Sequence, residues 1–174
     1  MSLSPQELKR IMPQASWENI DKYCEPLNQA MQEFDICDPL REAAFIAQVA
    51  HESGQFRYVR EIASGDAYEG RRDLGNVEPG DGARFRGRGL LQITGRYGYS
   101  KCGDALGLPL LEEPELLELP GNACRSAAWW WQEHGCNELA DRGAFKELTR
   151  RINGGYNGFR ERVDFYNRAL AAFS

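Results

Sequence analysis

The segment from Asp38 to Gly54, DPLREAAFIAQVAHESG, predicts the central helix of the fold. Asp38 can cap a helix, Pro39 suits its first position, and Gly54 supplies a stop. Between them the residues are mostly alanine and larger apolar side chains, which suits a helix that is buried on most of its sides. His51 and Glu52 therefore fall on the last turn of a largely buried helix, where polar side chains need an explanation.

Glu52 has two interpretations. Burial of a carboxyl group favours its neutral form, so Glu52 could hold a proton near neutral pH and act as a general acid. Alternatively, it could be a buried carboxylate that is paired with an arginine for structural reasons alone. A second carboxylate, Glu61, follows nine residues later, beside Arg57 and Arg60, and should stay ionised there. Two carboxylates in different settings are the minimum for acid/base cleavage of a glycosidic bond.

Helical patterns flank the central segment on both sides. Before it, Ser4-Pro5 and Ser16 begin two helices, and the second helix should bend or break at Pro26. The tryptophans at 129–131 cannot all face one way on a helix, so at least one should be exposed or on a cleft wall; core packing is favoured over sugar stacking for the others. The remaining expected helices run from Thr94 to about Ala105, from Pro114 to Leu119, from an Asn122 cap through the tryptophans, from Leu139 to Ile152 in one or two pieces, and from Phe159 to Phe173.

The segment from Ser64 to Gly89 lacks helical periodicity and is rich in glycine. It is either a long loop or a short antiparallel element with turns, and Arg84-Phe85-Arg86 alternates as a short strand would. Arginines crowd into this part of the chain. They could contact the substrate or the cell wall, or they could form a solvated face that neighbouring acids balance. The arginines are Arg71, Arg72, Arg84, Arg86, Arg88 and Arg96, and the acids are Glu69, Asp73, Glu78 and Asp81.

Length and composition predict one domain over residues 1–174, with no repeat, no linker and no separate cell-wall-binding domain. The net charge of −5 gives no reason to expect nucleic-acid binding. Five cysteines without a CxxC pair argue against a disulfide framework, so reduced and mostly buried thiols are expected. No signal peptide and no membrane-spanning run are visible, so we expect a protein that is made in the cytosol and is not inserted in a membrane.

The two histidines, His51 and His134, form no HExxH pattern and no compact ligand cluster, which argues against a zinc hydrolase or amidase. The cysteines lack a paired catalytic histidine, which argues against a cysteine peptidase. We therefore expect no metal and no cofactor. No feature of the sequence indicates oligomerisation, so a monomer is the default.

Five strings of the chain fall in a recognisable order between Pro39 and the C-terminus. They are His51-Glu52-Ser53-Gly54, Tyr68-Glu69-Gly70-Arg71, Leu74-Gly75-Asn76, the run from Phe85 to Gly95 (FRGRGLLQITG) and Ile152-Asn153-Gly154-Gly155. Together they resemble glycoside hydrolase family 19, and more narrowly its phage and prophage endolysin branch. The resemblance implies a mainly α (α+β) fold, lysozyme-like and bilobal, with a cleft between the lobes and a small β-element beside it.

The resemblance also assigns catalytic roles. Glu52 would protonate the leaving glycosidic oxygen, Glu61 would activate water on the opposite face of the sugar, and Thr94 would help to orient that water. Family members invert the anomeric centre, which requires carboxyl groups roughly 6.5–9.5 Å apart. Glu69, in one of the matched strings, is the rival of Glu61 as the base. The expected substrate-binding set is His51, Glu69, Gln92, Tyr97, Asn153 and Arg162, and Arg162 would also support the acid/base network.

Two positions depart from the plant members of the family. Gly98 stands where they carry asparagine, and Asn157 stands where they carry glutamate after the Asn-Gly-Gly turn. Both changes weaken chitin-specific contacts, so the expected substrate is bacterial peptidoglycan, cleaved for host cell lysis or wall degradation. A chitinase and a catalytically silent sugar-binding relative are the alternatives. The resemblance implies a lysis enzyme that is made in the bacterial host cytoplasm and needs a holin or another export route to reach the wall.

Overall fold

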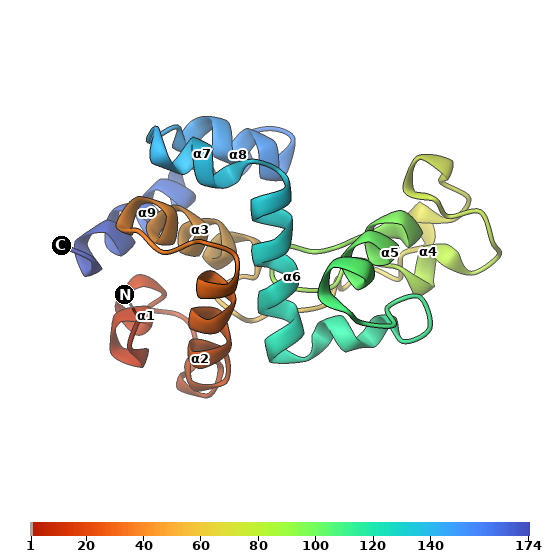
Figure 1. Cartoon of the computed structure of the whole chain (residues 1–174), viewed down its shortest axis with the longest axis horizontal. Helices are drawn as coiled ribbons and strands as arrows, with labels where there is room; N and C mark the ends of the chain where they lie inside the picture. The colour runs from red at the N-terminus through yellow and green to blue at the C-terminus, as the bar shows by residue number, and fades with distance from the viewer. Residues whose placement is uncertain (1) are drawn as a thin grey trace.

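The computed structural model describes residues 2–174, which form two unequal lobes that meet at one helix (Figure 1). The larger lobe holds both ends of the described chain, and the smaller lobe holds most of the glycine-rich middle. The larger lobe contains α1 (Pro5–Ile11), α2 (Trp17–Glu33), α3 (Pro39–Glu52), α7 (Cys136–Asp141), α8 (Phe145–Asn153) and α9 (Phe159–Ala172). The smaller lobe contains α4 (Asp81–Arg84), α5 (Gly95–Leu106) and the 3₁₀ turns η1 (Asp66–Tyr68) and η2 (Arg72–Leu74). A third turn, η3 (Pro114–Glu118), leads into α6 (Pro120–Glu133), where the lobes meet.

Each lobe has its own apolar core. The larger core surrounds α3, whose residues 42–50 are all buried, and α9 packs along this helix. The smaller core gathers Phe85, Tyr99 and Leu117 with neighbouring aliphatic side chains. Phe34 and Trp130 are partly buried and pack against both cores. The lobes are therefore connected through apolar contacts. The core of each lobe holds one wall of a cleft between them.

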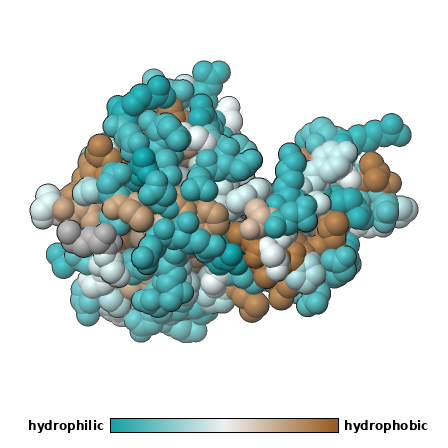
Figure 2. All heavy atoms as spheres, viewed as in Figure 1, coloured by the Kyte–Doolittle hydropathy of each residue, from teal (hydrophilic) through white to brown (hydrophobic). Residues whose placement is uncertain are grey.

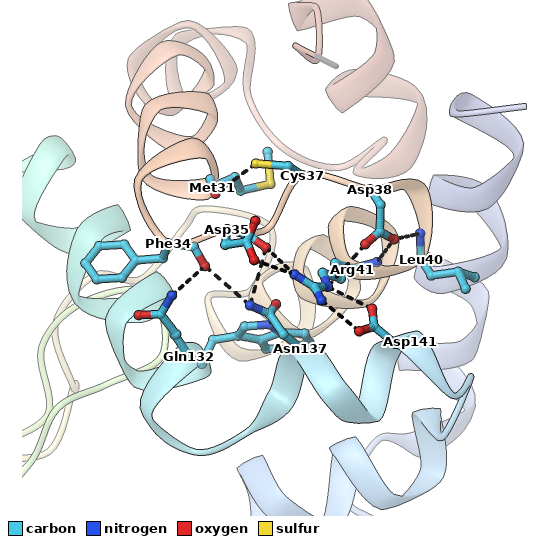
Figure 3. Close-up of polar contacts among 11 residues, drawn as sticks. Met31, Phe34, Asp35, Cys37, Asp38, Leu40, Arg41, Gln132, Asn137 and Asp141 are labelled. Carbon is cyan, nitrogen blue, oxygen red and sulfur yellow. Dashed lines mark hydrogen bonds and ion pairs between the residues drawn. The ribbon is translucent and has the colours of Figure 1, made fainter.

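Arg41 fixes the corner between α2 and α3 to α7 (Figure 3). Its guanidinium donates to Asp35 in the corner and to both carboxylate oxygens of Asp141 on α7, at 2.7–2.8 Å. Asp38 caps α3, because its side chain accepts from the backbone N–H groups of Leu40 and Arg41. The start of the central helix is thus defined both by its cap and by a contact with a helix 100 residues away.

Most predicted helices are confirmed, and so are the caps at Ser4, Ser16 and Asp38. Of the predicted bend or break at Pro26, the break is wrong, because α2 continues through the proline. Pro26 has no N–H to donate to the carbonyl of Lys22, four residues earlier. Lys22 lies on the exposed side of the helix, where water can bind that carbonyl instead. The predicted cap at Asn122 is also wrong: α6 begins at Pro120, and the Asn122 side chain donates to the Leu116 carbonyl instead.

The segment from Ser64 to Gly89 is a loop with short helical turns. The predicted strand at Arg84-Phe85-Arg86 is wrong, because Arg84 ends α4 and Phe85 caps it. The small β-element reduces, within residues 2–174, to two isolated antiparallel bridges, Arg60–Arg88 and Arg88–Ile93. The mainly helical lysozyme-like fold is otherwise as expected.

All five cysteines are free, and four of them are buried, which confirms the prediction of reduced and mostly buried thiols. Burial raises the pKa of the Cys102 and Cys136 thiols to about 12. Between residues 2 and 174, no helix combines the length and the apolar character that crossing a bilayer requires.

Candidate active site

Two adjoining cavities lie where the lobes meet, and the surface is hollowed between the lobes (Figure 2). The cavity that contains Glu52 has a volume of about 260 Å³, and Leu91, Gln92, Trp130 and Ile152 complete its lining. The second cavity, of about 500 Å³, shares Gln92 and Trp130 with the first. The two cavities therefore form one cleft with a carboxyl group at one end. The second cavity is also lined by Asp73, Leu74, Ile93, Thr94, Tyr97, Gly98, Lys101, Trp129, Glu133 and His134.

Arg162 of α9 connects Glu52 to a buried polar network. Its Nη2 lies 2.5 Å from Oε1 of Glu52, its Nη1 donates to Oε1 of Gln48 at 2.6 Å, and its Nε donates to the Asn157 carbonyl at 3.0 Å. Gln48 in turn donates to the Thr149 hydroxyl at 3.0 Å. Arg162, Gln48 and Thr149 are at most 1% exposed. The carboxyl group of Glu52 thus projects from a rigid, fully buried support.

The two carboxylate oxygens of Glu52 have different surroundings. Oε1 is buried against Arg162 but is placed for an ion pair without regular hydrogen-bond geometry. Oε2 has no hydrogen-bond partner among residues 2–174. Unlike Oε1, it is not buried, so it keeps access to solvent. The structural interpretation of Glu52 predicted a pair with an arginine, and the resemblance indicated Arg162. What goes beyond a purely structural pair is the accessible oxygen on a cavity wall beside Gln92.

Glu61 is oriented by two hydrogen bonds from the smaller lobe. The Tyr68 hydroxyl donates to Oε1 at 2.9 Å, and the Gly87 N–H donates to Oε2 at 3.1 Å. Gly87 also lies against the Gln92 side chain, because a Cβ atom built on it would lie only 2.6 Å from Oε1 of Gln92. Glu61 itself lines a further cavity of about 370 Å³ with Arg57 and other residues of the same stretch. The Gly87 backbone therefore connects Glu61 to the Gln92 side of the cleft.

Glu69 is engaged in holding the loop. Its two oxygens accept from the backbone N–H groups of Gly80 and Gly82, both at 2.8 Å. These glycines lie at the start of α4, so the carboxylate fixes the conformation of the loop before it. Glu69 lines none of the three cavities described above.

The other predicted site residues divide into two groups. Thr94 and Tyr97 line the larger cavity, and the Thr94 side chain makes no capping bond to α5. His51 and Asn153 line neither cavity of the cleft. His51 Nδ1 lies 3.0 Å from the Glu161 carboxylate, and its ring packs on the Gly158 backbone. Asn153 ends α8, and its Oδ1 accepts from a backbone N–H in the turn that follows.

The three tryptophans behave as the helical spacing predicted. Trp131 is fully buried and donates from Nε1 to Oδ1 of Asn137 at 2.8 Å. Trp129 and Trp130 are partly buried and line the larger cavity, and the Trp130 ring stacks on His134 at 3.8 Å. The cleft wall of α6 is therefore aromatic, which suits contact with a sugar ring.

Several arginines of the predicted cluster bind the acids that were expected to balance them. Arg96 binds Asp81 through Nε and Nη2, at 2.9 and 2.7 Å, and these bonds hold the pKa of that buried carboxyl below its usual range. Arg71 pairs with Asp73 in the same loop. The buried Arg88 instead binds Glu118, which the sequence did not indicate. These arginines organise the smaller lobe.

Sequence reasoning missed the supporting residues. Gln48 is the clearest case, because it lies one helical turn before Glu52 in an otherwise apolar stretch, and that spacing is a usable signal. Tyr68 was noted only as part of a string, and its bond to Glu61 has no local signature. Asn76, fully buried, donates to the Tyr68 carbonyl and accepts from the Arg96 N–H, which fixes the loop that presents Tyr68.

A two-lobed helical fold with a carboxyl group on the wall of the central cleft defines a lysozyme-like glycoside hydrolase. Residues 40–140 match the family model described as chitinase class I. A glycosyl hydrolase family 19 domain-containing protein of Haemophilus influenzae is 30% identical over 204 residues, which cover 98% of this chain and 96% of that protein. The chain therefore belongs to glycoside hydrolase family 19.

Solved chitinase structures share the fold. A class IV family 19 chitinase of Zea mays superposes with a TM-score of 0.79 at 25% identity, over 98% of this chain and 92% of that one. Chitinase C of Streptomyces griseus gives the same TM-score at 22% identity, over 98% and 76% of the two chains, which supports the fold alone. An Arabidopsis thaliana endochitinase is 41% identical over 114 residues, or 65% of this chain and 39% of that protein, so the chain spans less than half of its length.

Proposed function

We propose that this family 19 glycoside hydrolase cleaves glycosidic bonds of bacterial peptidoglycan by an inverting acid/base reaction. The observation that carries the chemistry is the setting of Glu52, which Arg162 holds from the buried side while Oε2 remains open to the cleft. A carboxyl group in that position can reach the oxygen that links two sugars in the cleft.

In the proposed reaction Glu52 donates its proton to the leaving glycosidic oxygen as the C1–O bond breaks. Glu61 takes a proton from a water molecule on the other face of the sugar, and the water oxygen bonds to C1. We favour Glu61 over Glu69 as the base because hydrogen bonds from Tyr68 and Gly87 orient Glu61, whereas the oxygens of Glu69 accept from the loop backbone. Gln92 and Thr94 would hold the sugar and the water on the cleft wall.

Two observations favour peptidoglycan over chitin. The Haemophilus influenzae relative, which matches the chain along nearly its whole length, is bacterial. In addition, Gly98 lines the larger cavity and has no side chain to fill it, which leaves room beside Thr94 for a sugar with a bulky substituent. Chitin has no such substituent, whereas every second sugar of peptidoglycan carries a lactyl group and a peptide.

The cellular role that we propose is lysis of a host cell or degradation of its wall, as in phage and prophage endolysins. The enzyme would be made in the cytoplasm, act as a monomer, and reach the wall through a holin or another export route. Release assays in cells with and without a co-expressed holin would test this part separately from the chemistry.

Product analysis tests the reaction itself. The purified chain should release fragments with new reducing ends from peptidoglycan, and mass spectrometry should show cut glycan bonds with intact stem peptides. Proton NMR at early times should show the inverted anomer. Peptide-only products would refute the proposal.

A chitinase is the second candidate, and the plant endochitinases that match 65–71% of the chain favour it. Chitin oligomers incubated in parallel decide between the two. Faster cleavage of chitin would establish the chitinase, and no products from either polymer would indicate a sugar-binding relative without activity.

A further inference from the structure

The outer face of α8 and its flanks carries cations that no acidic residue neutralises within the described chain. Residues 142–160 contain five cationic side chains and one carboxylate, whereas the whole chain has a net charge of −5. Arg151 pairs with that carboxylate, Glu147, at 3.7 Å. The other four have no ion-pair partner among residues 2–174 and are exposed. They are Arg142, Lys146, Arg150 and Arg160.

Lys146 and Arg150 form a continuous stripe. They lie four residues apart on α8 and therefore on the same face of the helix. The Lys146 ammonium group lies 5.2 Å from the ring centroid of Tyr156, in the turn after α8, and Tyr156 is 47% exposed. We call Lys146, Arg150 and Tyr156 the α8 rim. It combines two cations with an exposed aromatic surface.

Helix α8, which carries two residues of the α8 rim, also reaches the cleft. Ile152, near the end of α8, lines the cavity that contains Glu52. Arg151 donates to the carbonyl of His134, whose side chain lines the larger cavity. Helices α7 and α8 lie side by side at the end of α6 where the chain leaves the cleft wall (Figure 1). A polymer longer than the cleft must cross one of its edges, and α8 forms such an edge.

We infer that the α8 rim binds the free carboxylates of the stem peptides that project from a peptidoglycan strand in the cleft. This inference rests on the proposed function and names the part of that substrate which the rim recognises. Stem peptides carry free carboxylates, and guanidinium and ammonium groups bind them by charge-assisted hydrogen bonds. Chitin is uncharged and offers this surface nothing. The rim therefore contributes selectivity for the wall polymer, while Glu52 and Glu61 perform the reaction.

The test compares two wall preparations. Both are purified peptidoglycan with acetylated amines, and in one the free carboxyl groups are converted to neutral amides. The variant is Lys146→Gln/Arg150→Gln, which removes the two rim charges. The matched control is Arg10→Gln/Lys22→Gln, which removes two exposed charges from α1 and α2, on the other side of α3 and α9 (Figure 1).

The rim variant should lower kcat/KM on the native wall about fivefold, the effect of two exposed ion pairs, chiefly through KM. It should match the unsubstituted protein on the amidated wall, which also shows that it is folded, and the difference should vanish above about 0.5 M salt. Equal losses on both walls, no loss on the native wall, or the same loss in the control variant would overturn the inference.

Binding to insoluble wall, measured in the Glu52→Gln background, separates the rim from the chemistry. The rim substitutions should weaken retention on the native wall by a similar factor and leave retention on the amidated wall unchanged. If the unsubstituted protein releases no glycan fragments from either preparation, the proposed function fails. If it releases them and the rim variant behaves like the control, only the inference fails.

Discussion

Replacement of Arg162 by methionine should cost the protein much of its stability. The side chain is 1% exposed and makes three polar contacts, so methionine fills the space but leaves the Gln48 and Asn157 oxygens unpaired and the Glu52 charge uncompensated. Removing one partner of a buried ion pair costs roughly 3–5 kcal/mol. With a denaturant dependence of about 2 kcal/mol per molar urea, we expect the midpoint of unfolding to fall by about 2 M.

A double-mutant cycle tests the reason for this loss. If Arg162 mainly compensates the charge of the partly buried Glu52 carboxylate, then Glu52→Gln should recover part of the stability that Arg162→Met removes. We expect a coupling energy of about 2 kcal/mol, within the range measured for residues of one polar network. Urea unfolding of the four proteins, followed by circular dichroism, gives the value directly.

Arg125→Met is the matched control, because Arg125 forms a comparable pair with Glu33 on the surface. It should cost at most about 1 kcal/mol. Additivity of the Glu52 and Arg162 substitutions within about 0.5 kcal/mol would refute the reasoning, and so would a cost for Arg162→Met no larger than the control.

Three further outcomes are expected. Glu52→Gln should abolish release of glycan fragments while circular dichroism shows that the protein is still folded, because an amide cannot protonate the leaving oxygen; near-normal turnover would exclude Glu52 as the acid. Glu61→Gln should lower kcat at least about 100-fold, whereas Glu69→Gln should chiefly lower the melting temperature, and the reverse order would make Glu69 the base. Arg96 holds the pKa of Asp81 below its usual 3.8, so this pair stabilises the fold above about pH 4 and the contribution is lost as pH falls through the folded-state value. Asp81→Asn should flatten that loss in urea unfolding measured from about pH 6 to pH 2.

Helix starts were predictable where the cap is local. Ser4, Ser16 and Asp38 each bind a backbone N–H within three residues, so the sequence alone contains both partners. The start of α6 was placed wrongly at Asn122, since the side chain binds backwards to Leu116 instead of capping the helix. That choice depends on how η3 folds, which local sequence does not encode.

The loop from Ser64 to Gly89 was the least predictable part of the fold. Its conformation is set by contacts such as that of Glu69 with the backbone of Gly80 and Gly82, 11 and 13 residues away. Alternation in Arg84-Phe85-Arg86 suggested a strand, but no partner strand is present within residues 2–174, and the segment ends a helix instead. Local periodicity cannot reveal such contacts.

The sequence indicated the candidate carboxylates of the site, but it did not indicate Gln48, which binds Arg162 behind Glu52. The resemblance named Glu52, Glu61 and Gln92; Gln92 lines the cavity that contains Glu52 and lies against Gly87, whose N–H donates to Glu61. The contact of Arg162 with Gln48 spans 114 residues, and neither residue type signals the other. The resemblance indicated Arg162, whereas Gln48 required the packed arrangement of α3 against α9.

The distribution of the thiols makes this protein ready for attachment chemistry without mutagenesis. Cys37 is the exposed cysteine, while the other four are buried and burial raises the pKa of their sulfhydryl groups. Cys37 lies just before α3, and Glu52 ends that helix, about 20 Å further along its axis. A maleimide dye or a solid support joined to Cys37 would therefore leave the cleft open, and the immobilised protein could be presented to wall fragments in a defined orientation.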